Sequence, residues 1–144
     1  MLSCPDARGA GVLIGIGLDL VDAVRVEQAL RRFGERFVRK LMDPEEAGRL
    51  PVDEEARVAA LAAAVALKEA ASKAIGTGWS QGVRWRDVVV MKAEPLPAAG
   101  ASSARVRLDA RAAEAARAVG SSGRTRAQLQ RSGDLVVGEV WLLS

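Results

Sequence analysis

The chain has 144 residues, which is the length of one domain that can bury a core without disulfides or a structural metal. It contains no His and only one Cys, which excludes Ser-His-Asp and Cys-His nucleophilic sites, zinc sites of the usual ligands and a disulfide framework. The formal net charge of +3 suits an acidic or phosphate-bearing partner without identifying one. Because the chain has no His, general acid–base catalysis would use carboxylates, Lys or water. For the same reason a bound metal would have oxygen ligands, which favours a hard cation such as Mg²⁺.

Two classes of partner are disfavoured by the composition. Aromatic residues make up 3 % of the chain, too few for a surface that stacks nucleic-acid bases. The longest apolar run, 12–20, is far too short to span a membrane, and residues 1–11 lack a signal-peptide pattern. We expect a cytoplasmic protein with no nucleic-acid or membrane partner, in which a flexible N-terminus (1–11) precedes one domain (12–144).

The first predicted elements are a strand and a basic helix. The apolar run 12–18 indicates a buried strand that ends at Asp19. Apolar residues then recur at steps of three and four from Val26 to Leu41, which predicts a helix that Gly34 bends or divides.

Two helix starts follow. In Asp43-Pro44-Glu45-Glu46, the Asp is a candidate N-cap and the Pro suits the first helical position. A second start at Asp53 opens an Ala-rich helix that we expect to run to Ile75 and to stop at Gly76.

The second half of the chain reads mainly as strands. We predict strands at 84–91, 105–108, 126–131 and 135–143, a loop at 94–103 and a helix at 110–119, and we expect the last two strands to form a hairpin through 132–134. This order predicts an α+β fold with a small, mostly antiparallel sheet packed with a long helix.

Three features carry candidate chemistry, and each alone has an ordinary interpretation. Glu69 and Lys73 lie one helical turn apart, which is typical of an exposed ion pair. Asp19 follows a strand, where it would serve as a helix cap. The loop 76–78 reads Gly-Thr-Gly, and most such triplets are plain turns.

Together these features resemble a known family. Gly17 to Arg25 has the pattern Gly-x-Asp-x-x-x-x-x-Arg, and Lys68 to Gly78 is similar to Lys-Glu-Ala-x-x-Lys-Ala-x-Gly-Thr-Gly. Both motifs are typical of the holo-acyl-carrier-protein synthases, which are small trimeric 4′-phosphopantetheinyl transferases. The resemblance covers about residues 12–143, and it implies their fold and a homotrimer.

The resemblance also implies an activity and its residues. Such enzymes move 4′-phosphopantetheine from coenzyme A to a serine of an apo acyl carrier protein, with Mg²⁺ on the diphosphate. Asp19 and Glu69 correspond to the Mg²⁺ ligands and would be catalytic together with Lys73, which would contact the phosphate. Lys68 would be a phosphate or charge-balancing contact, and the amides of Gly76, Thr77 and Gly78 would lie along the cofactor. The general base would be a metal-bound water or Glu69.

The basic helix gains a role through the same resemblance, because in this family it docks the acidic helix of the carrier protein. Arg25 occupies the motif position, and Arg32, Arg36 and Arg39 are further candidate contacts. For these last three, a solvated helix face is the alternative.

The chain departs from the family pattern at three places. Ala64 and Val65 replace a common Arg-Phe pair, the loop 96–103 replaces a Gly-Lys-Pro loop, and 128–131 reads Gln-Leu-Gln-Arg where Ser-Leu-Ser-His is frequent. Two hypotheses therefore stand, an active transferase or a member that lost or changed this activity and binds a carrier protein or acts on a carrier-bound polyketide or fatty-acyl chain. A nucleic-acid-binding module explains the Arg content but not the motif pair.

Overall fold

The computed structural model describes residues 11–93 and 98–144. The predicted flexible segment 1–11 lies almost entirely outside the described residues, as do positions 94–97 of the predicted loop. In chain order the elements are β1 (Leu13–Asp22), α1 (Ala23–Phe33), α2 (Glu35–Leu41), α3 (Pro44–Gly48), α4 (Glu54–Ile75), the 3₁₀ turn η1 (Trp85–Asp87), β2 (Val88–Ala93), β3 (Ala99–Leu108), α5 (Ala110–Ala118), β4 (Arg124–Ser132) and β5 (Leu135–Leu143).

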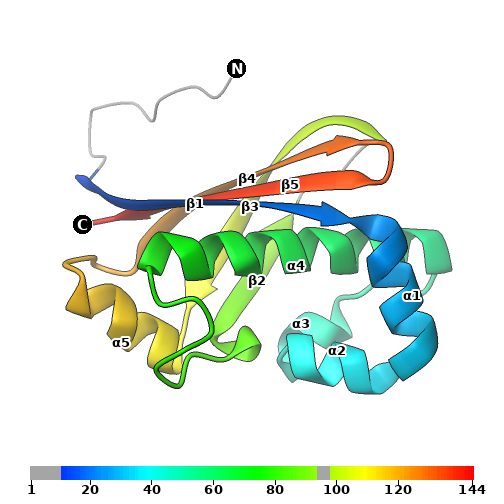
Figure 1. Cartoon of the computed structure of the whole chain (residues 1–144), viewed down its shortest axis with the longest axis horizontal. Helices are drawn as coiled ribbons and strands as arrows, with labels where there is room; N and C mark the ends of the chain where they lie inside the picture. Colours follow the sequence, from blue (N-terminus) through cyan, green and yellow to red (C-terminus); the bar gives the residue numbers. More distant parts are fainter. Residues whose placement is uncertain (1–10, 94–97) are drawn as a thin grey trace.

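The five strands form one antiparallel sheet in the order β1-β5-β4-β3-β2. Helix α4 lies along one face of this sheet, with α1 to α3 near one end of the helix and α5 near the other (Figure 1). The core fills the space between α4 and the sheet, and it is built largely from Ala on the helix and Val or Leu on the strands. This is the predicted α+β class with a long central helix.

The helix boundaries follow local chemistry. Gly34 adopts φ 54° and separates α1 from α2, a conformation that other residues rarely take. Asp43 accepts the amide of Glu46 at 2.8 Å, and Asp53 accepts the amide of Ala56 at 2.9 Å, so both predicted N-caps are confirmed. Gly76 ends α4 in the left-handed conformation.

The sheet differs from the prediction in three strands. The predicted strand 84–91 is wrong over 84–87, where Asp87 accepts the amide of Arg84 at 3.0 Å and the chain forms the 3₁₀ turn η1 before β2 begins at Val88. β1 continues past Asp19 to Asp22, because its pairing with β5 extends to Asp22 and Leu135. β3 begins at Ala99, so the predicted loop is wrong over 99–103, where the small residues pair with β4. The local composition favours a loop over 99–103, but backbone hydrogen bonds to the neighbouring strand β4 hold these residues in a strand conformation.

Helix α4 approaches the sheet closely because three strand positions are glycines. A Cβ placed on Gly17 would lie 1.8 Å from the carbonyl oxygen of Ala70, and a Cβ on Gly15 or Gly138 would also lie within 3.0 Å of the helix backbone. Among the described residues, no helix combines the length and apolar character needed to cross a membrane.

Candidate active site

Asp19 lies on β1 beside the C-terminal half of α4. Side chains alternate along a strand, so Asp19 shares the helix-facing side of β1 with Gly17 and Val21. Its side chain is 20 % exposed. The helix cap considered for Asp19 is instead provided by Asp22, which accepts the amide of Val24 at 2.9 Å. Asp19 therefore has no capping role and turns toward α4.

Lys73 faces Asp19 from α4. Its Nζ donates to Asp19 Oδ1 at 2.7 Å and to the carbonyl oxygen of Leu18 at 3.3 Å. The hydrogen bond to Asp19 raises the pKa of Lys73 above its ordinary value, and the negative charges of Asp19 and Glu69 act in the same direction. The ion pair of Lys73 thus joins two elements 54 residues apart, rather than linking Lys73 to Glu69 within the helix.

Two carboxylates and one ammonium group therefore gather at this edge of α4. In residues 11–93 and 98–144, no three His, Cys, Asp or Glu side chains come together to hold a metal by themselves. Mg²⁺ is usually bound by one or two carboxylates and completes its shell with waters and substrate phosphates. The pair Asp19 and Glu69 therefore fits a Mg²⁺ that binds together with a diphosphate.

Lys68, predicted as a cofactor contact, lies on another side of α4. Its side chain is fully buried, and Nζ donates to Glu46 Oε1 at 2.8 Å, to the carbonyl oxygen of Trp85 at 3.1 Å and to that of Val88. Burial lowers the pKa of Lys68, and the charge of Glu46 opposes this shift. A buried ammonium with three acceptors has no donor left for a phosphate, so we do not retain Lys68 as a phosphate contact. The charge that Lys68 balances in the structure is that of Glu46, which is not one of the predicted site residues.

The Gly-Thr-Gly loop closes the C-terminal end of α4. The amide of Gly76 donates to the carbonyl oxygens of Ser72 and Lys73, and the amide of Gly78 donates to that of Ser72. Two of the three amides predicted to lie along a cofactor are therefore used in ending the helix. Only Thr77 keeps its amide outside the helix-capping bonds of this loop.

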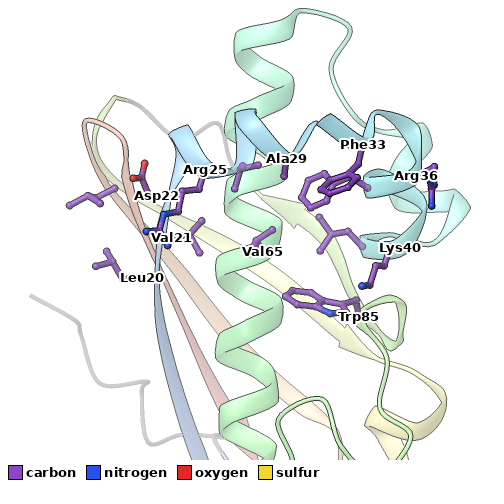
Figure 2. Close-up of a pocket in the computed structure, with 14 residues that line it drawn as sticks. Leu20, Val21, Asp22, Arg25, Ala29, Phe33, Arg36, Lys40, Val65 and Trp85 are labelled. Carbon is purple, nitrogen blue, oxygen red and sulfur yellow. The ribbon is translucent and has the colours of Figure 1, made fainter. Parts of the chain in front are cut away.

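An apolar cavity of about 750 Å³ lies between β1, α4 and the α1–α2 pair, and Asp19, Glu69 and Lys73 are not among the residues that line it. Val65 of α4 lies at its centre, and Trp85 and Phe33 lie on the side of η1 and α1 (Figure 2). Val65 precedes Glu69 by four residues, which places the two side chains on the same face of α4. Arg25 and Arg36 border the same cavity.

The predicted carrier-binding arginines are thus only partly brought together. Arg25 and Arg36 border the cavity together with Lys40, whereas Arg32 lies outside its lining and places its guanidinium 5.1 Å from the ring centroid of Phe33.

Trp85 was not singled out by sequence reasoning, although Trp is rare in this chain. It stacks on Trp79 with 4.2 Å between ring centroids.

The positions that depart from the family pattern lie in different surroundings. Ala64 is buried in the core, while Val65 lines the cavity, where its small side chain leaves space. Arg131 donates from Nε to the carbonyl oxygen of Gly133 at 2.8 Å, so it belongs to the β4–β5 turn.

Comparison with known proteins agrees with this arrangement. The profile of the 4′-phosphopantetheinyl transferase superfamily matches residues 15–128. The chain belongs to this superfamily. A holo-[acyl-carrier-protein] synthase of Methylobacterium sp. is 43 % identical over 66 % of this chain and 73 % of that protein. One from Nitratidesulfovibrio vulgaris is 36 % identical over 92 % of this chain and its own full length.

A solved structure shows the same fold. The holo-[acyl-carrier-protein] synthase of Helicobacter pylori, crystallised in complex with coenzyme A, has a TM-score of 0.68 and 21 % identity over 88 % of this chain and 98 % of that one. The match confirms the predicted phosphopantetheinyl transferase fold. The superfamily profile and the holo-[acyl-carrier-protein] synthase relatives identify the chain as an enzyme of the phosphopantetheinyl transferase type.

Proposed function

We propose that this enzyme transfers 4′-phosphopantetheine from coenzyme A to a serine of an apo acyl carrier protein and that it requires Mg²⁺. The observation that carries the proposal is the convergence of Asp19, Glu69 and Lys73 from two elements far apart in sequence. Relatives that bear the name holo-[acyl-carrier-protein] synthase support the choice of substrates.

The reaction exchanges one phosphorus–oxygen bond for another. The serine Oγ bonds to the phosphorus that carries pantetheine, and the bond from this phosphorus to the bridging oxygen breaks, which releases adenosine 3′,5′-bisphosphate. The serine proton passes to water or to the Glu69 carboxylate. Mg²⁺, when bound by Asp19 and Glu69, neutralises charge on the diphosphate. Lys73, kept protonated by Asp19, stabilises the negative charge on the leaving oxygen.

The apolar cavity shares the Val65–Glu69 face of α4 and is the proposed binding place of the pantetheine arm. Its apolar lining, which includes Val65 and Trp85, suits the hydrocarbon parts of the pantetheine arm. Arg25, Arg36 and Lys40 at its border suit the acidic surface of a carrier protein, since complementary charge steers the encounter of two proteins. Arg32 is retained as a second, more distant carrier contact.

The proposal includes a homotrimer in the cytoplasm. On the side of β1 away from α4, Ile16, Leu18 and Leu20 are each more than half exposed. Leu135 on the neighbouring strand β5 is 47 % exposed. A row of exposed apolar side chains of this size is typical of a surface covered by another subunit. Light scattering at several protein concentrations tests the trimer.

The function is tested with apo carrier protein, coenzyme A and Mg²⁺, followed by the intact mass of the carrier. We expect a phosphopantetheine adduct that forms with Mg²⁺, is lost in EDTA and returns when Mg²⁺ is added. Asp19→Asn and Glu69→Gln should remove most of the rate, whereas Glu114→Gln on α5 should retain it. An adduct that forms at the wild-type rate in both site variants would contradict the metal site, and the absence of an adduct would contradict the transfer.

A further inference from the structure

One buried ion pair in the core, Lys68–Glu46, belongs to no step of the proposed reaction. Lys68 and Glu46 are fully or almost fully buried, and their side chains meet at 2.8 Å. Lys68 Nζ has three acceptors, which is the full donor capacity of an ammonium group. Glu46 uses its second oxygen to accept the amide of Val90 at 3.1 Å.

This pair joins four elements that are distant in sequence. Glu46 belongs to α3 and Lys68 to α4, and the backbone partners Trp85, Val88 and Val90 belong to η1 and β2. Each of these hydrogen bonds has a direction, so together they fix the side of α4 that faces η1 and β2. Apolar contacts alone would allow the helix to slide or turn slightly.

The opposite side of α4 is fixed by the sheet. Gly15 and Gly17 of β1 and Gly138 of β5 leave no room for a Cβ against the helix backbone at Ala66, Ala70 and Ala74. The helix is therefore held from two sides, by the glycines and by the Lys68–Glu46 pair. Glu69 follows Lys68 in the chain, so any rotation of α4 about its axis moves the Glu69 carboxylate relative to Asp19.

A buried ion pair of this kind is weak support for the stability of a fold. Apolar side chains of similar volume often replace such a pair at little or no cost in stability, whereas removal of one partner alone is strongly destabilising. An apolar replacement makes no directional hydrogen bonds, so it can preserve the stability of the fold without fixing the rotation of α4. An apolar double variant can therefore distinguish a positioning role from a stabilising role.

We propose that Lys68 and Glu46 are positioning residues that fix the rotation of α4 and thereby hold Glu69 opposite Asp19. The inference rests on the proposed function for its kinetic consequence but not for its structural one. A displacement of about 1 Å at a reacting group lowers the rate by about 100-fold.

The test is the double variant Lys68→Met/Glu46→Met, which removes both charges and keeps the volume. We expect an unfolding midpoint somewhat below that of the wild type, because the Val90 amide and the Trp85 and Val88 carbonyls lose a partner, but above that of Lys68→Met alone, which leaves a buried charge unpaired. The kcat should fall by about 10- to 100-fold, and KM for coenzyme A should change by less than about threefold. Glu46→Gln keeps one acceptor oxygen for Lys68 but loses the charge and the acceptor for the Val90 amide, so we expect lower stability and a kcat between those of the double variant and the wild type. A double variant that is stable and has the wild-type kcat would overturn the proposal.

Further measurements distinguish a positioning role from a simple loss of stability, and from a failure of the proposed function. Leu129→Ala, which opens a cavity in β4, and Lys68→Met alone should both lose stability, but only the Lys68 variant should lose kcat at a temperature where both are folded. Equal kcat values would show a merely structural role. If the wild type transfers nothing, the proposed function fails. A crystal structure of the double variant then decides, because we expect Glu69 displaced from Asp19 by about 1 Å, and an unmoved Glu69 would refute positioning.

Discussion

Replacing Gly17 with Ala should separate β1 from α4 and so disrupt the site without touching its charged groups. The added Cβ would lie 1.8 Å from the carbonyl oxygen of Ala70, whereas real Cβ contacts are essentially never shorter than 3.0 Å. The atom in the way is backbone, so the helix must retreat by roughly 1 Å. Overpacking of this kind costs about 1–3 kcal/mol of unfolding free energy. A shift of about 1 Å between Asp19 and Lys73 should also lower kcat by about 100-fold.

The assay combines urea denaturation with the rate of transfer to an apo carrier protein, both at 25 °C. The matched control is Gly48→Ala in α3, where a Cβ meets no atom within 4 Å. This substitution should leave kcat unchanged and stabilise the helix by about 0.5–1 kcal/mol, because Ala loses less backbone entropy than Gly. A Gly17→Ala protein with wild-type stability and wild-type kcat would refute the close contact between β1 and α4.

Three further predictions concern charge and capping. Asp19→Ala or Glu69→Ala should each lower kcat/KM by at least about 100-fold, with little change in the unfolding midpoint, and a retained rate would show that the metal lies elsewhere. Arg36→Glu should raise KM for the carrier protein by about tenfold at low salt and less at high salt, while Arg117→Glu on α5 should not; equal effects would indicate a nonspecific charge effect. Asp43→Ala should cost about 1 kcal/mol of unfolding free energy by removing a helix cap, and an unchanged midpoint in urea would show that the cap contributes nothing.

The helices were largely predictable because their signals are local. Asp43 and Asp53 as N-caps and Gly34 and Gly76 as breaks act on neighbouring residues, so the chain alone reveals them. The first residues of β3 were not predictable from the same kind of reasoning. Their small side chains favour a loop, and only pairing with β4 makes them a strand.

The candidate site was likewise only partly predictable from the sequence. The motifs predicted that Asp19, Glu69 and Lys73 belong together, and the structure brings them to one edge of α4. The motifs gave no indication that Lys68, inside the second motif, is buried. Its partner Glu46 lies 22 residues away, and an ordinary helix-start pattern accounts for that residue.

The cavity was not predictable because it depends on how three elements pack. Val65 was recognised only as a departure from a family pattern, and Trp85 was not recognised at all. Neither residue carries a charge or a metal-binding group, so no chemical signature marks it in the sequence. Only the packing of α1 and α2 against α4 and η1 shows that the two side chains share one space.

The proposed reaction transfers phosphopantetheine from coenzyme A to a carrier-protein serine. The most direct measurement is the intact mass of an apo acyl carrier protein after incubation with the enzyme, coenzyme A and Mg²⁺, with the modified residue located by fragmentation. We predict a gain of one phosphopantetheine group on a single serine, absent when that serine of the carrier is replaced with alanine. A carrier that keeps its apo mass while coenzyme A remains intact would contradict the account.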